Sequence, residues 1–519
     1  MRILVNSKEM KQIDKDTIEE TKIPSMVLME RAALAVAEVI RQRVDAPSVL
    51  CVCGCGNNGA DGLAVARILL ETQIPTKVLI LGKEEAATKE WKQQREILGN
   101  LGIPVVTKPC LAEYTVIVDA IFGIGLSRKI EGSYAEWIEK INKSGVRVIS
   151  IDIPSGISAD TGEVLSIAVK ADITVTFGLL KAGLIFYPGA FYAGEILVKE
   201  IGFPKKNIDK VNPMLYTCGK EALLQIPRRM PDSNKGSVGK ICILAGSKNM
   251  AGAAYLAAKA AYRMGVGLVR IITSEVNREI LQVLLPEAVL VTYQGGQDIK
   301  EVLQASFQWA DVVAAGPGLG MEKDAFALIE VLSEYADKNK EKNYVLDADA
   351  LNILAKKKEW MERFSNCAII TPHIGEMARF METDIVSVQQ NRVLFARRVA
   401  GEYHIICALK DARTIVCGED GMCYINTSGN SGMATAGSGD VLCGVIAGCL
   451  AMGLPAKKAA EIGVYLHGLA GDRAKDRLGE HGVMAQDIVE ELPQVLCGLE
   501  EDKTEGENNG DRCKYRRFI

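Results

Sequence analysis

Short apolar runs recur along the chain and are separated by segments in which apolar residues have helical spacing. Such an alternation is typical of a parallel β-sheet with helices on both faces. In the first half, the pattern predicts buried strands at residues 49–53, 77–81, 115–120, 146–151 and 173–176. Helices are predicted between them, notably at residues 62–70 and 134–142. The first half therefore reads as a Rossmann-like α/β sheet.

A second series of strands follows, at residues 240–245, 269–273, 311–315, 344–346, 368–371 and 404–409. Residues 211–239 lie between the two series and are rich in Pro, Lys, Arg and Gly, so we place a domain boundary near residues 215–230. The pattern predicts two different α/β domains, at residues 1–215 and 226–498. Residues 499–519 lack apolar periodicity, and we expect a disordered tail there.

The composition excludes several classes of protein. The 519 residues are 48% hydrophobic and 24% charged, which suits two globular domains with proper cores. The net charge is −4 and the Lys and Arg residues are dispersed, so we expect no binding to nucleic acid. No run reaches the roughly 18 apolar residues that span a membrane, and the opening segment lacks the apolar core of a signal peptide. We expect a cytoplasmic protein without a membrane partner.

The fourteen cysteines are scattered, and many lie inside apolar runs. We expect them to behave as small buried hydrophobic residues and not as disulfide partners. Cys51, Cys53 and Cys55 could suggest a metal site, but no second pair of cysteines and no histidine follows nearby. A buried strand that enters a glycine turn is the better interpretation.

The segment GCGNNGADG, residues 54–62, follows a predicted strand and precedes a helix. Open α/β sheets bind ligands at the carboxyl ends of their strands, and glycines allow phosphates to approach the backbone. Asn57, Asn58 and Asp61 add more polar side chains than a plain turn needs, so a ligand site is favoured. The segments at residues 119–127 and 152–156 fall at equivalent strand ends. Their oxygen atoms could also enclose a monovalent or divalent cation.

In the second half, TAGSGD at residues 435–440 leads directly into the apolar segment 441–450, which reads as a buried helix. A glycine turn at a helix N-terminus favours anions, and we expect Asp440 to stay ionised there and accept a proton from a substrate hydroxyl. An ordinary capped turn is the alternative. Lys410 and Arg413 follow another strand, where they could meet phosphate oxygens or simply lie at a solvated hairpin end.

Several segments together resemble the bifunctional NAD(P)H-hydrate repair enzymes, whose N-terminal epimerase domain is fused to a ribokinase-like dehydratase domain. The N-terminal segments are GCGNNGADG, DAIFGIGLSRKIEG, DIPSGISADTG and TFGLLKAGL, which begin at residues 54, 119, 152 and 176. The C-terminal segments are LAGSKNMAGAAYLAAKAAYRMGVGLV, AAGPGLG, LDADALN, TPHIGEMARF and NSGMATAGSGDVLCG, which begin at residues 244, 314, 346, 371 and 430. The resemblance covers residues 1–495.

The resemblance implies repair of NADH and NADPH that have taken up water at C6 of the nicotinamide ring. The first domain would interconvert the R and S hydrates, and the second would phosphorylate the S hydrate and eliminate phosphate. The expected co-substrate is ADP, with ATP possible, and the products are AMP and phosphate. We also expect Mg²⁺, K⁺ in the epimerase site, and a homo-oligomer. The alternative is a ribokinase-like kinase for a vitamin precursor with a regulatory or noncatalytic ligand-binding N-terminal domain.

The resemblance also assigns residues of the epimerase site. Asp152 would be the acid/base group, with Lys181 a weaker candidate, and the potassium ligands would be Asn58, Asp119 and Ser155. The hydrate would contact Asn57, Asn58, Gly59, Ala60, Asp61, Gly123, Ile124, Gly125, Leu126, Ser127, Arg128, Lys129 and Asp152. The chain departs from the family pattern at Ala60, usually glycine, and at Lys129, often proline, so the loop geometry at Ala60 needs a compatible backbone.

In the dehydratase domain, the resemblance implies that Asp440 is the catalytic base. The hydrate would contact Ala253, Gly320, His373 and Asp440, and the nucleotide would contact Lys410, Asp411, Ala412, Arg413, Thr414 and Gly439. His373 is expected at a strand end, where an uncharged imidazole could position a carboxamide or ribose. His404, His467 and His481 have no comparable position. Asp347 and Asp349 could serve Mg²⁺ or cap a helix.

Overall fold

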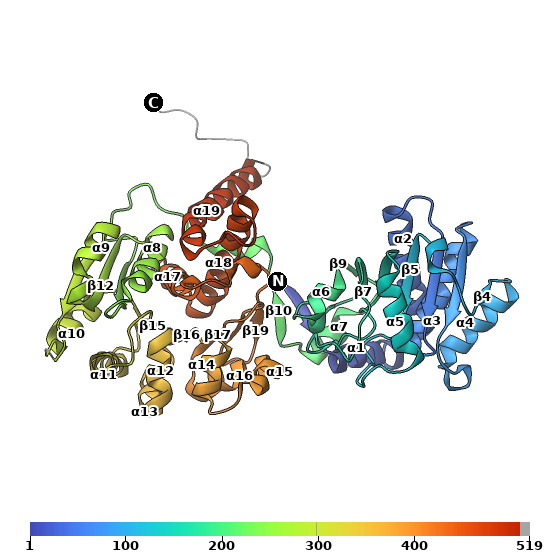
Figure 1. Cartoon of the computed structure of the whole chain (residues 1–519), viewed down its shortest axis with the longest axis horizontal. Helices are drawn as coiled ribbons and strands as arrows, with labels where there is room; N and C mark the ends of the chain where they lie inside the picture. The colour runs from blue at the N-terminus through green and yellow to red at the C-terminus, as the bar shows by residue number, and fades with distance from the viewer. Residues whose placement is uncertain (297, 509–519) are drawn as a thin grey trace. The chain divides into compact units, whose positions relative to one another are not determined.

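The chain forms two compact α/β units in the computed structural model, one of residues Arg2–Leu215 and the other from Tyr216 onward (Figure 1). The structure describes residues 1–296 and 298–508. For residues 498–508 it describes only the backbone. Each unit is built on a mainly parallel sheet that is covered by helices, so the predicted fold class is confirmed.

The N-terminal sheet has the strand order β4-β3-β2-β5-β6-β7-β9, and all of its pairings are parallel. In this doubly wound order the chain reverses its direction of winding between β2 and β5. The strands are β2 (Val49–Cys53), β3 (Thr76–Ile80), β4 (Val105–Val106), β5 (Val116–Ala120), β6 (Arg147–Ile151), β7 (Ile173–Phe177) and β9 (Glu195–Lys199). The apolar pattern does not predict β4 and β9, because neither strand is fully buried.

Alternate side chains of β2 belong to hydrophobic clusters on opposite faces of this sheet. Val49, Cys51 and Cys53 pack with α2 and α3, whereas Leu50 and Val52 pack with α5. This division places helices on both faces, as the apolar runs predict. The helices are α1 (Ser7–Glu19), α2 (Ser25–Arg43), α3 (Asn57–Glu71), α4 (Lys89–Asn100), α5 (Ser133–Lys143), α6 (Gly189–Ala193) and α7 (Lys205–Val211). Outside this seven-stranded sheet, β1 (Arg2–Val5) pairs in parallel with β8 (Leu180–Lys181).

In the C-terminal unit, the spatial order of the strands is β13-β12-β11-β14-β15-β16-β17-β18-β19. The short strand β10 (Leu215–Thr217) precedes all of them along the chain. The pairings are parallel from β13 to β17 and antiparallel from β17 to β19. Here the reversal lies between β11 and β14. The strands are β11 (Lys240–Leu244), β12 (Leu268–Ser274), β13 (Val289–Tyr293), β14 (Val312–Ala315), β15 (Asn343–Leu346), β16 (Ala368–Ile370), β17 (Ile406–Leu409), β18 (Ile415–Cys417) and β19 (Cys423–Ile425).

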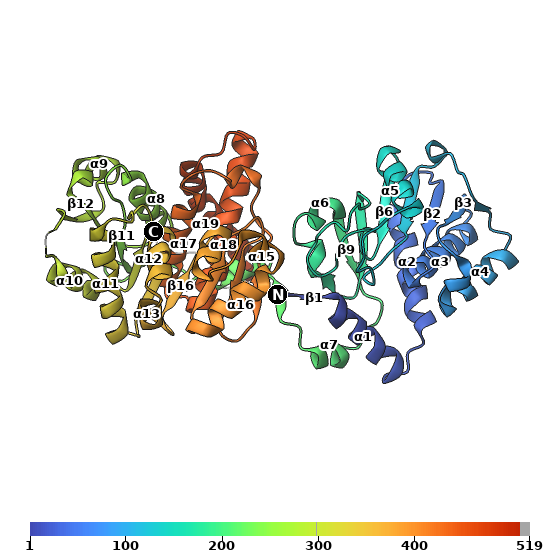
Figure 2. The ribbon, with the colours of Figure 1, turned by 60° about the horizontal axis from the view of Figure 1, so that its bottom comes forward.

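Helix α17 (Ser438–Ala451) lies at the centre of this unit, and its residues Val441 to Leu450 are buried, as predicted. It packs with α8, α18 and α19 in one hydrophobic cluster on one face of the sheet, while α11 and α12 lie on the other side (Figures 1 and 2). The remaining helices are α8 (Ala251–Arg263), α9 (Arg278–Leu284), α10 (Lys300–Trp309), α11 (Lys323–Lys338), α12 (Ala348–Lys356), α13 (Lys358–Met361), α14 (Ile374–Phe380), α15 (Ile385–Gln390), α16 (Arg392–Tyr403), α18 (Ala456–Leu478) and α19 (Ala485–Asn508).

Two expectations differ from the structure. Helix α19 continues to Asn508, so residues 499–508 of the expected disordered tail are helical, and residues 509–519 lie outside the described part of the chain. Cys417 and Cys423 form a disulfide between the paired strands β18 and β19, although we expected no disulfides. The antiparallel pairing brings these two cysteines opposite each other. None of the described helices is long and apolar enough to cross a membrane.

Candidate active sites

The loops after β2 and β5 meet where the N-terminal sheet reverses. Helix α3 begins at Asn57, so residues Asn57 to Asp61 form its first turns and not the loop that the sequence suggested. The glycines allow this close packing, because a Cβ atom on Gly54 would lie 2.1 Å from the carbonyl oxygen of Ile121. One on Gly59 would lie 1.8 Å from the carbonyl oxygen of Gly54. The free N–H groups of a first helical turn favour an anion here.

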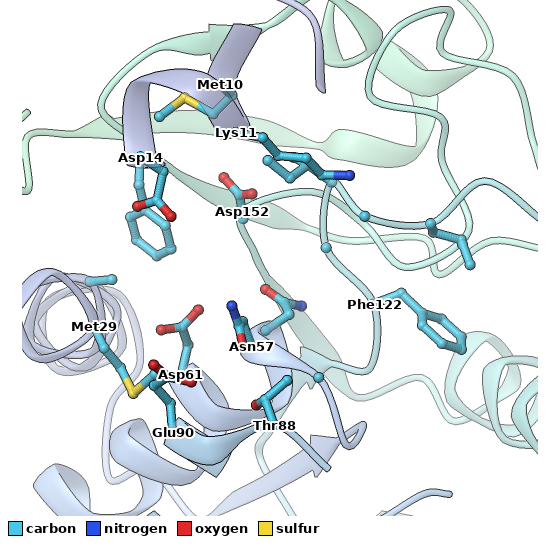
Figure 3. A pocket seen from close by; sticks show the side chains of 18 of the residues that line it. Met10, Lys11, Asp14, Met29, Asn57, Asp61, Thr88, Glu90, Phe122 and Asp152 are labelled. Carbon is cyan, nitrogen blue, oxygen red and sulfur yellow. The ribbon is translucent and has the colours of Figure 1, made fainter. Parts of the chain in front are cut away.

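A cavity of about 720 Å³ opens at this edge of the sheet (Figure 3). Its volume is within the range of ligand sites in enzymes. The predicted residues that line it are Asn57, Asn58, Asp61, Gly123, Ile124, Gly125, Leu126, Ser127, Arg128 and Asp152. Gly59 and Ala60 are buried inside α3, and Lys129 is exposed outside the cavity. The N–H group of Ala60 donates to the Gly56 carbonyl at 3.0 Å within a regular helix, so the extra methyl group does not strain the backbone.

Asp152 follows β6 with a left-handed backbone, φ 66°, which is uncommon outside glycine and is often found at functional sites. The Lys181 ammonium group donates to Asp152 Oδ1 at 2.6 Å. It also donates to Thr176 Oγ1 at 3.0 Å and to the Phe177 carbonyl at 2.8 Å, and the Lys181 side chain is only 1% exposed. Because these contacts use the ammonium hydrogens, Lys181 is suited to hold the Asp152 carboxylate and not to exchange protons.

Sequence reasoning missed one wall of the cavity, which comes from α1, α2 and α4. On α1, Met10, Asp14 and Ile18 line the cavity at intervals of four residues, so they share one helical face. Met29 on α2 and Glu90 on α4 complete this wall. The spacing on α1 was a signal, but spacing alone does not tell which part of the sheet the face covers.

The three proposed potassium ligands lie around the loop after β5. Asp119 is fully buried; its Oδ2 accepts hydrogen bonds from Ser150 Oγ at 2.8 Å and from the Ser155 backbone N–H at 2.9 Å. Burial raises the pKa of Asp119, although its hydrogen bonds with Ser155 and Ser150 oppose the shift. The Ser155 hydroxyl accepts from the Phe122 N–H at 2.8 Å.

The Asn58 amide nitrogen is buried without a hydrogen-bond partner, which marks an unsatisfied position beside Gly123. Amide, hydroxyl and carboxylate oxygens suit a hard cation, so the side chains Asn58, Asp119 and Ser155 fit one chemically. Across the described residues, no group of three or more His, Cys, Asp or Glu side chains is placed to hold a metal ion. The fit therefore depends on the neutral oxygens as much as on the single carboxylate.

In the C-terminal unit, Asp440 lies in the first turn of α17 after Gly437, whose φ is 89°. A Cβ atom on Gly437 would lie 2.5 Å from Leu256, so the turn requires glycine. Burial, and then repulsion by Asp347, raises the pKa of Asp440 to about 7. The expectation that the helix N-terminus keeps Asp440 fully ionised is wrong, because the loss of hydration outweighs that effect. A group with this pKa can both accept and return a proton near neutral pH.

Lys410 lies beside this helix start. Its ammonium group donates to Asp347 Oδ1 at 2.6 Å and lies 3.9 Å from Glu376 Oε2. Burial disfavours the charged form, but the two carboxylates outweigh it and raise the pKa of Lys410. A Cβ atom on Gly439 would lie 3.3 Å from the ammonium nitrogen, so lysine and glycine turn face the same space. Asp347 precedes α12, but its side chain makes no capping hydrogen bond to that helix. The helix-capping interpretation of Asp347 is therefore wrong.

His373 caps α14. Its Nδ1 accepts from the N–H groups of Gly375 at 3.0 Å and Glu376 at 3.4 Å, while the His373 N–H donates to Glu376 Oε2 at 2.8 Å. Burial, and then Lys410, lower the pKa of His373, so the ring is neutral as expected. Asp349 accepts from the Gly320 N–H at 2.8 Å, which fixes the turn after β14.

The other predicted contact residues are only partly directed toward this site. Asp411 pairs with Arg392, and Arg413 donates to the Thr427 carbonyl at 3.1 Å. Thr414 is 8% exposed and Ala412 is exposed. Ala253 is nearly buried in the first turn of α8, where a Cβ atom on Gly318 would lie 2.8 Å away. Ala253 and Gly320 thus follow β11 and β14, the two strands between which this sheet reverses.

His467 on α18 contradicts the expectation that it has no special setting. It is 8% exposed, and its Nε2 lies 3.4 Å from Ser438 Oγ in the glycine turn. Burial lowers the pKa of His467 to about 4, so the imidazole is neutral at physiological pH. No sequence pattern predicts this contact, because His467 is 29 residues away from Ser438 and on a different helix.

Comparison with known proteins identifies the family. A family model described as NAD(P)H-hydrate dehydratase matches residues 241–494, and one described as YjeF-related protein N-terminus matches residues 25–183. The bifunctional NAD(P)H-hydrate repair enzyme Nnr of Thermofilum pendens is 37% identical over 514 residues, covering 95% of this chain and 96% of that protein. The chain belongs to the family of bifunctional NAD(P)H-hydrate repair enzymes.

The repair enzyme of the same name from Moorella thermoacetica is 38% identical and aligns over 96% of this chain and 97% of its own length. A ribokinase-like superfamily protein from Enterococcus faecalis, solved by crystallography, has 28% identity and a TM-score of 0.50. The match covers 55% of this chain and 96% of that structure. The predicted family and two-domain enzyme are confirmed, and they are favoured over the small-molecule kinase with a noncatalytic N-terminal domain.

Proposed function

We propose that this chain repairs NADH and NADPH hydrated at C6. The N-terminal unit interconverts the R and S hydrates, and the C-terminal unit dehydrates the S hydrate with ADP, releasing AMP and phosphate. The observation that carries the proposal is the 95% coverage by a relative named for this repair. A ligand-sized cavity in one unit and a buried carboxyl group at a glycine turn in the other agree with two separate sites.

In the N-terminal unit, Asp152 is the proposed acid/base group for epimerisation. Its carboxylate faces the cavity, and Lys181 fixes its orientation through a 2.6 Å ion pair. The first turn of α3 and the glycines at 123 and 125 provide backbone N–H groups for the phosphates of the coenzyme. Potassium would be held by Asn58, Asp119 and Ser155, and when bound it supplies positive charge that favours an anionic substrate.

In the C-terminal unit, Asp440 removes the proton of the C6 hydroxyl as that oxygen attacks the terminal phosphorus of the nucleotide. This step replaces hydroxide, a poor leaving group, by phosphate. The lone pair of the ring nitrogen then expels phosphate as C5 loses a proton, which restores the C5–C6 double bond. Lys410 and the N–H groups at the start of α17 would orient the phosphate oxygens; this role is supported by the 3.3 Å distance from the Lys410 ammonium nitrogen to a Cβ atom on Gly439.

Mg²⁺ is the proposed companion of the nucleotide. Such ions are usually held by one or two carboxylates together with phosphates and water. Asp347 and Asp349 each have an oxygen that already accepts a hydrogen bond, from Lys410 at 2.6 Å and from Gly320 at 2.8 Å. Either side chain would therefore have to hold the ion through its other oxygen. A homo-oligomeric state and a cytoplasmic location stay predictions.

The test is to incubate the full chain with separated R and S NADH hydrates and with ADP, ATP or neither. The recovery of dihydronicotinamide absorbance reports dehydration, and chromatography reports the remaining epimers. We expect epimerisation without nucleotide and dehydration only with nucleotide, faster with ADP. Faster dehydration with ATP would refute the choice of co-substrate, and a lack of both reactions would refute the proposed function.

A further inference from the structure

Four carboxyl groups line the N-terminal cavity, and one of them, Glu90, accepts a hydrogen bond from Ser25. The other three come from separate elements. Asp14 comes from α1, Asp61 from α3 and Asp152 from the turn after β6, and their side chains point into the same space in Figure 3. Lys181 forms an ion pair with Asp152. Within the described part of the chain, the carboxyl groups of Asp14 and Asp61 have no hydrogen-bond donor and no ion-pair partner.

The surroundings of the three groups differ. Asp152 accepts a hydrogen bond from the Lys181 ammonium group at 2.6 Å, so a fixed cation holds its carboxyl group in place. Burial raises the pKa of Asp61 well above its usual value, and repulsion by Asp152 and then Asp14 adds to the shift. Burial, followed by repulsion from Asp152 and Glu90, also raises the pKa of Asp14. Two carboxyl groups with environments that differ in this way are suited to opposite roles in proton transfer.

We propose that Asp61 donates a proton during epimerisation, opposite Asp152, and that Asp14 is a positioning residue that keeps this proton on Asp61. The proposal rests on the epimerase function proposed above and names the second proton-transfer group that the reaction needs. Asp14 can act in this way because its place on the cavity-facing side of α1 directs its negative charge toward the space that Asp61 also faces.

The chemistry of a C6 hydrate needs both a proton acceptor and a proton donor. The C6 oxygen gives its proton to the Asp152 carboxylate and forms a carbonyl, while the C6–N1 bond breaks. The electron pair of that bond stays on N1, which takes the proton of Asp61. Ring closure from the opposite face of the carbonyl reverses both transfers, so the epimer changes while atoms, charge and protons balance.

The variants Asp61→Asn and Asp14→Asn separate the two roles. We expect Asp61→Asn to lower kcat for epimerisation by about 100-fold or more with little change in KM, because an amide does not supply an acidic proton. Asp14→Asn removes the neighbouring negative charge, so Asp61 loses its proton at lower pH. The basic limb of the pH profile of kcat should move down by about 1 pH unit.

A merely structural role for Asp14 would lower kcat equally at every pH. Asp14→Glu keeps the charge, and we expect it to restore the basic limb toward its original position. Glu19→Gln is the matched control, because Glu19 is on the same helix, exposed and outside the cavity. Besides Asp14 and Asp61, the charged groups that line the cavity are Lys11 on α1 and Glu90, Arg128, Asp152 and Lys181 from other elements.

Chromatographic separation of the epimers measures the reaction in the full chain without nucleotide, and dehydration of the S hydrate with ADP serves as an internal control. The proposal is overturned if Asp61→Asn keeps more than about a tenth of kcat, or if the basic limb of Asp14→Asn coincides with that of the original chain. If the unsubstituted chain does not epimerise the hydrate, the proposed function fails instead, so the two failures are distinguishable.

Discussion

Replacing Asp440 by asparagine should abolish dehydration and at the same time stabilise the C-terminal unit. The amide keeps the size of the side chain but cannot accept the proton of the C6 hydroxyl, so we expect kcat to fall by about 100-fold or more. Nucleotide binding should persist, because Lys410 and the N–H groups of α17 are unchanged. The stability gain follows from the burial that raises the pKa of Asp440 to about 7.

The size of this gain follows from linkage between protonation and folding. The folded pKa of Asp440 is about 7, above its ordinary value of 3.8, so the folded state binds the proton more tightly than the unfolded state. This stabilising contribution is complete below pH 3.8 and is lost as the pH rises to about 7. At 1.36 kcal/mol per pKa unit, the loss is at most about 4 kcal/mol. Asparagine does not titrate. The free energy of unfolding of Asp440→Asn, relative to that of the original chain, should therefore be about 3 kcal/mol larger at about pH 8 than at about pH 5.

Urea unfolding at the two pH values measures the difference, and hydrogen exchange of the α17 amides attributes it to the C-terminal unit. Asp476→Asn is the control, because Asp476 is an exposed carboxylate on α18. Two results would refute the reasoning. An Asp440→Asn variant that is no more stable than the original chain at pH 8 would show that burial does not penalise the charge. Turnover above about a tenth of normal would exclude Asp440 as the base.

Three further predictions concern other parts of the chain. Asp119→Ala should slow epimerisation, remove its potassium dependence and leave dehydration unchanged; epimerisation rates equal to those of the original chain at every potassium concentration would exclude the Asn58, Asp119 and Ser155 site. Since the folded pKa of His467 is lowered from 6.5 to about 4, its contribution to stability is present above pH 6.5 and lost as the pH falls to about 4. Between pH 6.5 and pH 4, the free energy of unfolding measured with urea should therefore decrease by about 3 kcal/mol less for His467→Gln than for the original chain. An equal decrease in both proteins would contradict a neutral buried ring. A fragment ending at Leu215 should interconvert the epimers without nucleotide, and one starting near Pro227 should consume only the S hydrate rapidly with ADP and Mg²⁺; rapid consumption of both hydrates by the second fragment would contradict the division of labour.

Much of the fold could be predicted because central parallel strands are buried on both faces. Strands such as β2 and β11 appear as unbroken apolar runs, and α17 appears as a long apolar segment after a glycine turn. The short or exposed strands β4 and β9 leave no such pattern. The start of α3 was misplaced because Gly, Asn and Asp favour loops locally, whereas close packing of Gly54 and Gly59 fixes a helix there.

The candidate sites were only partly visible in the sequence. Polar residues at strand ends pointed to Asp152, since parallel strands bring their carboxyl ends together, and the glycine turn before an apolar helix pointed to Asp440. The contributions of Asp14 and His467 depend on which way a distant helix faces, and sequence spacing does not determine that. The charge state of Asp440 was misjudged because burial depends on the packing of the whole unit.

The most direct test of the account follows a mixture of both NADH hydrate epimers with ADP and Mg²⁺, using the full chain and its Asp152→Asn variant. Dihydronicotinamide absorbance reports repair, and chromatography identifies the remaining epimer. We expect rapid recovery to completion with the full chain. With Asp152→Asn, we expect a rapid phase limited to the S hydrate and then a slow phase limited by spontaneous epimerisation. A single rapid phase to completion with Asp152→Asn, or no recovery with the unsubstituted chain, would contradict it.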